Sequence, residues 1–292
     1  MQLLDGEYYL ARGRQSAILN ATLELVYPKH SSFTGILESS KAEPPSIGQI
    51  QIENESSRMI FIYPGEKNIV QDLCTLVEGL GVRAGALGAH FMLAAVDESS
   101  PLHYALRQCC YHPLFSQKYW KINLGGNFKT APEHRWRSAG SQDLISIQSF
   151  LRACLPPLVQ TIWRLNPQNY PDFLLYTKSG LCGITSIHRY GDSAFVYPLL
   201  LPGYDHPEQA LAALIQMIAA RNSYLLIPSF QNFLERTQTC LKAVTVLKQS
   251  LLVKYFVIHQ KATIAVEESL LIQERIRKPN PPLAPTERRD KN

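Results

Sequence analysis

The sequence predicts an α/β protein with a mixed β-sheet, built from two similar units in tandem. Strand-like and helix-like patterns alternate between residues 58 and 122, and the same order of patterns returns between residues 194 and 258. Matched residues of the two units lie 132 to 138 positions apart: Gly48 and Gly183, Pro64-Gly65 and Pro202-Gly203, Gln117 and Gln249, and Lys121 and Lys254. A nearly constant offset between elements in the same order indicates duplication of one α/β unit.

The first unit is expected to span residues 1–124. Hydrophobic spacing predicts helices over residues 13–28, from Ile69 to Leu80, and from Pro101, which follows the capping residue Ser100. Alternating or continuous apolar runs predict strands over residues 32–37, 47–52, 59–63, 90–96 and 115–122. The glycines at positions 79, 81, 85 and 88 are expected to end the second of these helices. A strand, a helix and a further strand in this order predict a right-handed parallel crossover.

The second unit is expected to span residues 134–262, after a linker over residues 125–133. It begins with a short strand near residue 134 and with helices on both sides of Pro156-Pro157. The order of the first unit then returns. Strands are expected at 173–177, 183–188, 194–201, 224–227 and within 244–258, with helices opened by Pro207 and Ser229. Residues 277–292 are rich in proline and charge, a composition typical of a disordered tail.

Composition and charge exclude several classes of protein. The chain has 292 residues, of which 46% are hydrophobic and 18% charged, which is typical of a globular protein. No apolar run approaches the roughly 18 to 20 residues that span a membrane, and the first residues lack a signal-peptide core, so we expect a cytoplasmic protein with no membrane partner. Most of the formal charge of +5 comes from residues 277–292. A nearly neutral folded part argues against a nucleic-acid partner.

The cysteine and histidine patterns give no support for a metal site. The six cysteines contain no CxxC pair, and the eight histidines contain no HExxH arrangement. Cys74, Cys109 and Cys240 fall on apolar helical faces. We therefore expect structural thiols in a reducing compartment, and no metal cofactor.

The order of elements resembles the GNAT (N-acetyltransferase) superfamily: a helix, an antiparallel meander, then strand, helix, strand, helix and strand. The stretch HFMLAAVDESSPLHYALRQCCYHPLFSQKYWKI is similar to the superfamily's fifth strand, fourth helix and following strands. An Ala-Leu-Arg-x-x-Gly-Phe ending is common in that helix, and here residues 105–111 read ALRQCCY. The stretch FQNFLERTQTCLKAVTVLKQSLLVKYF is similar in the second unit. The resemblance implies two tandem GNAT-like units.

The resemblance also implies a binding site for acyl-coenzyme A. In that superfamily the cofactor lies in a V-shaped opening between the fourth and fifth strands, and backbone N–H groups at a helix start hold its pyrophosphate. We expect strands separated at Ile62 and Leu93 if the cofactor binds, whereas a closed ladder would exclude it. The implied cofactor-binding residues are Ile62, Tyr63, Gly65, Glu66, Lys67, Asn68 and Ile69. This turn, at Pro64-Gly65, and the matching turn of the second unit, at Pro202-Gly203, each contain one glycine. Both therefore depart from the superfamily's Arg/Gln-x-x-Gly-x-Gly/Ala pattern.

The superfamily's catalytic residues are matched less completely in this sequence. Many members of the superfamily use a tyrosine of the fourth helix to protonate the leaving thiolate. The matching positions are Leu106 and approximately Gln238, which cannot act as acids. Tyr104 and Tyr111 are nearby substitutes, and Glu53 or Glu55, at the end of the third strand, is the candidate base for an amine.

Two hypotheses follow. The first is an acyltransferase that moves an acetyl group from acetyl-coenzyme A to an amine of a small molecule or a protein. The second is a non-catalytic GNAT-like module that binds a small molecule or a protein partner. A dinucleotide-binding protein finds little support, because the glycines of GLGVRAGALGAH follow a helix instead of opening one. The sequence leaves open whether the chain forms a homodimer.

Overall fold

The structure, a computed structural model, describes residues 2–7, 9–11, 32–38, 45–53, 55–63, 70–122, 135–162, 170–178, 180–218 and 220–256. Several predicted features lie outside these ranges: the helix at 13–28, the turn at 64–69, the linker at 125–133 and the tail at 277–292. The division into units at residues 124 and 134 therefore stays a prediction. The described residues fall in one compact unit of the chain.

The first half of the chain contains, among its described residues, six strands, two helices with described bounds, and a further helical stretch at residues 6, 7 and 9–11. The strands are β1 (Gln2–Leu3), β2 (Ser32–Leu37), β3 (Ser46–Glu53), β4 (Ser56–Tyr63), β5 (Phe91–Val96) and β6 (His112–Ile122). The helices are α2 (Val70–Ala86) and α3 (Pro101–Gln108). The predicted start of α3 is confirmed, because the Ser100 hydroxyl accepts a hydrogen bond from the Leu102 N–H at 3.3 Å.

The prediction that glycines end α2 is wrong for three of the four positions. Gly79, Gly81 and Gly85 lie inside the helix, and only Gly88, with a φ of +95°, lies beyond its end. A methyl group on Gly81 would lie 3.1 Å from the ring of Phe256. The missing side chain therefore makes room for an aromatic ring, a reason that the sequence of the helix alone does not contain.

The second half contains six strands among its described residues. They are β7 (Trp136–Ser138), β8 (Phe173–Thr177), β9 (Gly180–Tyr190), β10 (Ser193–Leu200), β11 (Asn222–Pro228) and β12 (Ala243–Tyr255). Its helices are η1 (Ser141–Asp143), α4 (Leu144–Cys154), α5 (Pro157–Ile162), α6 (Pro207–Ile218) and η2 (Ser229–Thr237), where η marks a 3₁₀ helix. The helix expected after Ser229 is thus a 3₁₀ helix, and the expected final strands form one long strand.

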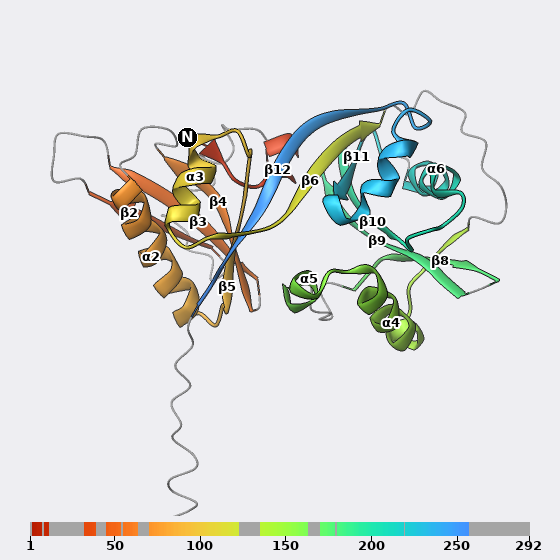
Figure 1. Ribbon diagram of the computed structural model, residues 1–292, viewed down its shortest axis with the longest axis horizontal. Helices are drawn as coiled ribbons and strands as arrows, with labels where there is room; N and C mark the ends of the chain where they lie inside the picture. Colours follow the sequence, from red (N-terminus) through yellow and green to blue (C-terminus); the bar gives the residue numbers. More distant parts are fainter. Residues whose placement is uncertain are drawn as a thin grey trace, which may run out of the picture. The chain divides into compact units, whose positions relative to one another are not determined.

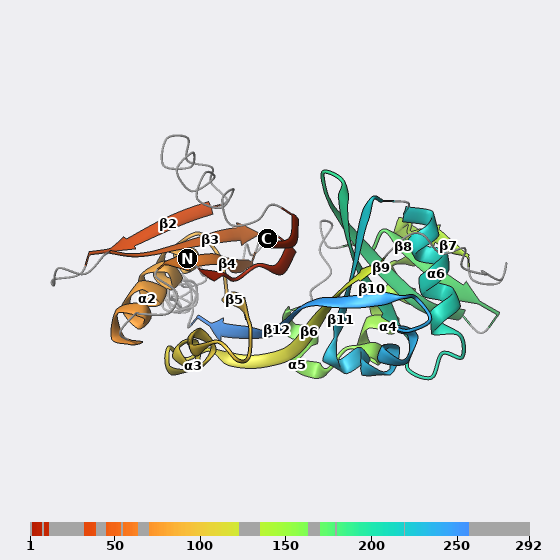
Figure 2. The same cartoon turned by 90° about the horizontal axis from the view of Figure 1, so that it is seen from above.

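The strands form a single mixed sheet in the order β2-β3-β4-β5-β12-β6-β11-β10-β9-β8-β7, and β1 pairs with β4 (Figures 1 and 2). The pairs β4–β5 and β10–β11 are parallel, as the crossover prediction requires, and the other neighbours are antiparallel. The last strand of each half pairs with the other half: β12 lies beside β5, and β6 lies beside β11. The mixed α/β fold with two similar halves is therefore as predicted, with its final strands exchanged.

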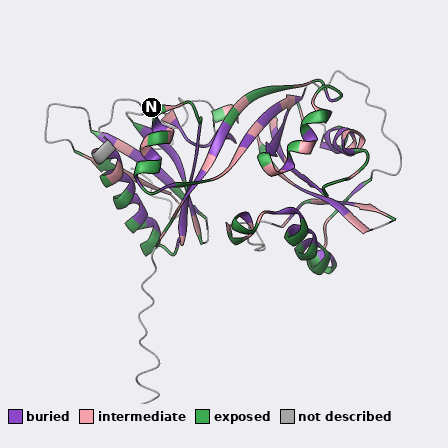
Figure 3. Cartoon of the chain, in the orientation of Figure 1, coloured by how far each residue is buried: buried purple, intermediate pink, exposed green. Residues whose placement is uncertain are grey.

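Helices cover the sheet by burying apolar faces. In the first half, α2 and α3 pack on one face of β3, β4 and β5, in a cluster that includes Ile50, Met59 and Met92 (Figures 1 and 3). In the second half, α6 packs on Val196 and Leu225, whereas α4 packs against the neighbouring Leu199. Successive residues of a strand point to opposite faces, so α6 and α4 cover opposite sides of β10. None of the described helices is long and apolar enough to cross a membrane.

A disulfide joins the two helices of the first half. Cys74 of α2 and Cys109 at the end of α3 are bonded, with their Cα atoms 4.9 Å apart. The expectation of free thiols is wrong for this pair, because it could not take account of two helices packed side by side on the sheet. Cys110, Cys154, Cys182 and Cys240 are free.

Candidate functional site

The parallel strands β4 and β5 separate partway along their length. They pair over three positions, Ser56 with Phe91, Ser57 with Met92, and Arg58 with Leu93. Beyond Arg58 the main-chain groups of the two strands no longer meet. We call the space between residues 60–62 of β4 and Ala95 of β5 the first opening. Of the two residues at which separation was expected, Ile62 lies beyond the paired positions, whereas Leu93 still pairs with Arg58.

The N-terminus of the chain fills the first opening. Gln2 lies opposite Ile62, and Leu3 lies opposite Phe61, in antiparallel pairing. Leu4 then bridges both strands, because its N–H donates to the Ile60 carbonyl at 2.8 Å and its carbonyl accepts from the Ala95 N–H at 3.1 Å. The Leu4 side chain has no exposed surface, and full burial of a leucine contributes about 1.5–3 kcal/mol. The sheet is thus continuous across the opening.

The second half has an equivalent opening between β10 and β11. These strands pair in parallel from Ser193 with Asn222 to Val196 with Leu225, and β10 continues to Leu200. The buried carboxamide of Gln231, in η2, lies at the end of β10. Its Oε1 accepts from the Leu200 N–H at 3.0 Å, and its Nε2 donates to the Leu200 carbonyl at 3.1 Å. One side chain therefore pairs with β10 as a strand would.

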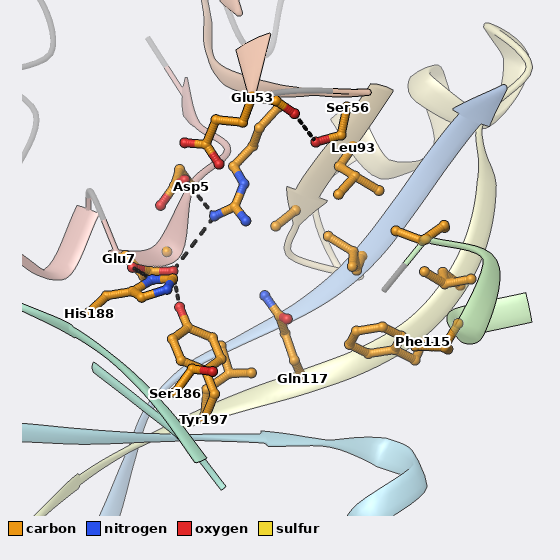
Figure 4. Close-up of a pocket in the computed structure, with 18 of the residues that line it drawn as sticks. Asp5, Glu7, Glu53, Ser56, Leu93, Phe115, Gln117, Ser186, His188 and Tyr197 are labelled. Carbon is orange, nitrogen blue, oxygen red and sulfur yellow. Dashed lines mark hydrogen bonds and ion pairs between the residues drawn. The ribbon is translucent and has the colours of Figure 1, made fainter. Parts of the chain in front are cut away.

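A cavity of about 340 Å³ lies where the two halves meet (Figure 4). Its polar wall carries side chains from the N-terminus and from strands of both halves: Asp5, Glu7, Glu53, Ser56, Arg58, Ser186, His188 and Tyr197. Its apolar wall comes from β5, β6, β12 and α5: Phe91, Leu93, Leu114, Phe115, Val159, Ile162 and Leu251. In Figure 4, Asp5, Glu7, Glu53 and His188 lie on one side, and Leu93 and Phe115 on the other.

Glu7 bonds to three other side chains of the polar wall. Its buried carboxylate pairs with His188 Nδ1 at 3.0 Å and with Arg58 Nη1 at 3.6 Å, and it accepts a hydrogen bond from the Tyr197 hydroxyl. Arg58 Nη1 also donates to Asp5 Oδ2 at 3.1 Å. Because Glu7 and Asp5 precede β2 whereas His188 and Tyr197 belong to β9 and β10, this network joins the N-terminus to the second half.

The network also shifts the pKa values of side chains in the wall. The hydrogen bond to Glu7 raises the pKa of His188, although burial opposes the imidazolium. Desolvation lowers the pKa of Arg58, but the carboxylates of Asp5 and Glu7 outweigh this effect and raise the pKa above its usual value. The guanidinium therefore remains charged. Burial is also the main cause that raises the pKa of Tyr119 in the same wall, which keeps the phenol neutral. The wall thus carries the Arg58 cation, several acidic side chains and neutral hydroxyl groups, and the bond to Glu7 favours the protonated form of His188.

A helical turn holds the two acidic residues in place. Immediately after Leu4 the chain becomes helical, and the Tyr9 N–H donates to the Asp5 carbonyl at 2.9 Å. Gly6 packs against the buried ring of Tyr119, where an added methyl group would lie only 2.6 Å from the ring. The close approach leaves no space for a side chain at position 6. The sequence Asp5-Gly6-Glu7 therefore combines two carboxylates with a residue that can lie against the cavity floor.

The predicted site residues have different positions. Glu53 lines the cavity, whereas Tyr104 is 65% exposed on α3 and Tyr111 is buried in the core beneath the helices. Burial raises the pKa of Tyr111 far above its usual value. Of the predicted cofactor residues, Ile62 is buried opposite Gln2 and Tyr63 is exposed at the end of β4. The remaining five, Gly65, Glu66, Lys67, Asn68 and Ile69, lie outside the described residues.

Asp5, Glu7, Arg58, His188 and Tyr197 were not predicted as site residues. They come from four separate elements, so no local motif connects them. The one available signal is the acidic pair Asp5 and Glu7 directly after an apolar dipeptide near the start of the chain. Among the described residues, no group of three or more histidine, cysteine, aspartate or glutamate side chains is arranged to hold a metal ion.

Several solved structures superpose on this chain at low sequence identity. The GCN5-related N-acetyltransferase from Kribbella flavida superposes with a TM-score of 0.50 at 12% identity, over 86% of this chain and 98% of that one. The corresponding enzyme from Sphaerobacter thermophilus gives 0.46 at 13% identity, over 72% and 76%. A tandem GNAT protein from the clavulanic acid biosynthesis pathway gives 0.43 at 8% identity, over 81% and 87%. No family model matches the sequence, and no curated protein sequence matches it.

The first of these superpositions, together with the order of the strands, defines the fold. The chain has the fold of the GCN5-related N-acetyltransferases, in agreement with the resemblance seen in its sequence. At identities of this size the likeness concerns the fold alone. The function has to be argued from the cavity and the two openings.

Proposed function

We propose that this chain is a GNAT-fold protein that binds a small organic amine in the cavity between its halves. The observation that supports the proposal is the excess of carboxylates over cations in the cavity wall. Asp5, Glu7, Glu53 and Asp172 line it, against Arg58 and His188. An acidic wall attracts a cation, and it does so more strongly where the surroundings exclude water.

The opposite wall indicates what the rest of the ligand is like. It is formed by aliphatic side chains and by the rings of Phe91 and Phe115. The cavity volume of about 340 Å³ is within the range of small-molecule sites. An amine attached to an apolar body matches both walls. A protein amine on a lysine side chain is the alternative acceptor, and it would have to enter from the surface.

Acyl-coenzyme A, which the fold implies, does not fit the first opening as it stands. The main-chain groups of Ile60 and Ala95 that face the opening are already bonded to Leu4. A second extended molecule would need the same groups. The function that fits this half best is therefore binding, without acyl transfer.

A second candidate function is acetyl transfer from acetyl-coenzyme A to the bound amine. Two observations favour it: the fold itself, and the second opening, where the Gln231 side chain bonds to the end of β10. Glu53 is the predicted residue that lines the cavity and can accept a proton from an amine. For this candidate we also propose a cytoplasmic location. The Cys74–Cys109 disulfide is a reason to test that location, because disulfides are unusual in reducing compartments.

Calorimetric titration of the full chain tests the proposal. Three probes of similar shape separate charge from apolar contact: 2-phenylethylamine, 2-phenylethanol and 3-phenylpropionate. We expect the amine to bind most tightly and the carboxylate not to bind. Glu53→Gln should weaken the amine at least threefold, whereas Tyr104→Phe, an exposed control on α3, should not change it.

Equal binding of the three probes, or preference for the carboxylate, would reject an amine site. Release of free thiol from acetyl-coenzyme A in the presence of the amine would establish the second candidate over the first. If Glu53→Gln lowers the rate of thiol release and the affinity for the amine by the same factor, Glu53 contributes to amine binding and not to the transfer itself.

A further inference from the structure

We propose that the N-terminal segment Gln2–Glu7 couples the first opening to the cavity, so that an extended ligand in the opening and an intact amine site exclude each other. The inference rests on the proposed function for the amine. The occupation of the opening and the placement of the two carboxylates are separate observations. Together they make one short segment part of two sites.

The segment occupies the opening as a strand would. It pairs with β4 through Gln2, Leu3 and Leu4, and the Leu4 carbonyl accepts from Ala95 of β5. An amide-bearing chain that entered between these strands would require the Ile60 carbonyl and the Ala95 N–H. Buried main-chain groups have to be paired, and each of these is paired with Leu4. Such a ligand can bind only after the segment leaves.

The same segment forms the acidic wall of the cavity. Asp5 directly follows Leu4, and Glu7 lies three residues after Leu4. Three residues of chain reach at most about 10 Å even when fully extended. Withdrawal of Leu4 from the opening therefore moves Asp5 and Glu7, and it separates Arg58 and His188 from their carboxylate partners.

The segment is also held in place by packing and hydrogen bonds at Leu4, Gly6 and Glu7. Leu4 is fully buried in the cluster beneath α2 and α3, and Gly6 lies against the ring of Tyr119. Glu7 reaches across to His188 and Tyr197 in the second half. A segment held at these points cannot shift gradually; it is either in the opening with both carboxylates in the cavity, or out of both places.

Amide-resolved hydrogen exchange and calorimetry test the coupling. In the native chain, the amides of Leu4 and Ala95 should be protected, and coenzyme A should leave their protection unchanged. Leu4→Asp places a charge in the core and should expel the segment. We expect this variant to bind coenzyme A at least tenfold more tightly, with new protection at residues 60–62, and to lose 2-phenylethylamine binding. Ile36→Asp, at an exposed site on β2, is the matched control and should change neither.

A second variant covers the case in which Leu4→Asp does not fold. Leu3 and Phe61 lie directly opposite each other, so Leu3→Cys with Phe61→Cys can be joined by a disulfide. The oxidised form should keep amine binding and refuse coenzyme A at residues 60–62. Coenzyme A that protects residues 60–62 in the oxidised form would overturn the coupling. If the native chain binds no amine, the proposed function fails, yet hydrogen exchange still decides whether the segment closes the opening.

Discussion

Gln117 of β6 and Gln249 of β12 lie directly opposite each other in the pair of strands that joins the two halves. These residues are 132 positions apart and occupy matching places in the two units. Lys118 faces Lys248 on one side of the pair, and Ser116 faces Ser250 on the other. Identical residue types thus face each other at three successive positions of this antiparallel pair, as the duplication predicted from the sequence would require.

Two lysines opposite each other would repel, so each has an acidic partner. Lys118 pairs with Glu235 at 2.7 Å, and Lys248 pairs with Glu98 at 3.6 Å. The glutamates come from η2 and from the turn after β5, so each half contributes one. Strand exchange therefore makes the two halves one sheet.

The close approach of Gly6 to Tyr119 gives a first prediction. Gly6→Ala should destabilise the chain by about 1–3 kcal/mol, because the new methyl group overlaps a packed ring. Gly79→Ala is the matched control: Gly79 is helical and has no atom within 4 Å of the added methyl group. That change should stabilise by about 0.5–1 kcal/mol. Urea unfolding measures both, and equal effects would contradict the packing described.

The Gln231 carboxamide gives a second prediction. Gln231→Met has similar size but removes the partner of the Leu200 N–H and leaves the Leu200 carbonyl only its contact with Cys154 Sγ at 4.0 Å. Each buried group left unpaired costs about 1–3 kcal/mol. We expect a clear loss in the free energy of unfolding and faster hydrogen exchange at the Leu200 amide. Gln108→Met, at the exposed end of α3, should leave both unchanged. Unaltered exchange at Leu200 would show that the carboxamide does not pair with β10.

The Cys74–Cys109 disulfide closes a loop with a sequence separation of 35 residues. In the chain-entropy account, a loop of this length is worth about 3–4 kcal/mol. Calorimetry with and without a reducing agent should therefore show a lower melting temperature for the reduced chain, and Cys74→Ser should reproduce the loss. Cys110→Ser removes an exposed free thiol and serves as the control. A reduced chain with an unchanged melting temperature would argue against the bond.

The sequence predicted most of the elements because their patterns are local. The strands β4 and β5 and the start of α3 follow from hydrophobic period and from Ser100-Pro101. The partners of the last strands were not predictable in this way. The pairing of β12 with β5 joins residues more than 150 positions apart, and no local pattern distinguishes it from pairing within one half.

The candidate site was only partly predictable for the same reason. Glu53 was identified because it ends a strand of a known topology. The strand Gln2–Leu3 has two residues, which is too short to show any period. The role of Asp5 and Glu7 depends on where this strand lies, and the role of His188 depends on Glu7. A site made from distant elements becomes visible only in three dimensions.

The last prediction concerns pH. His188 bonds to Glu7, and this bond raises its folded pKa above the unfolded value of about 6.5. The imidazolium therefore contributes stability that is fully present below about pH 6.5 and is lost as the pH rises through the folded pKa. The groups that face the ring or act on its charge are Glu7, Tyr197, Arg58 and Glu53.

We expect the difference in melting temperature between the native chain and His188→Gln to be largest near pH 6 and to shrink towards pH 9. Titration of the His188 ring proton by NMR gives the folded pKa directly. A midpoint at or below 6.5 would mean that Glu7 does not hold the imidazolium, and that the carboxylate at the centre of the cavity lacks the partner described here.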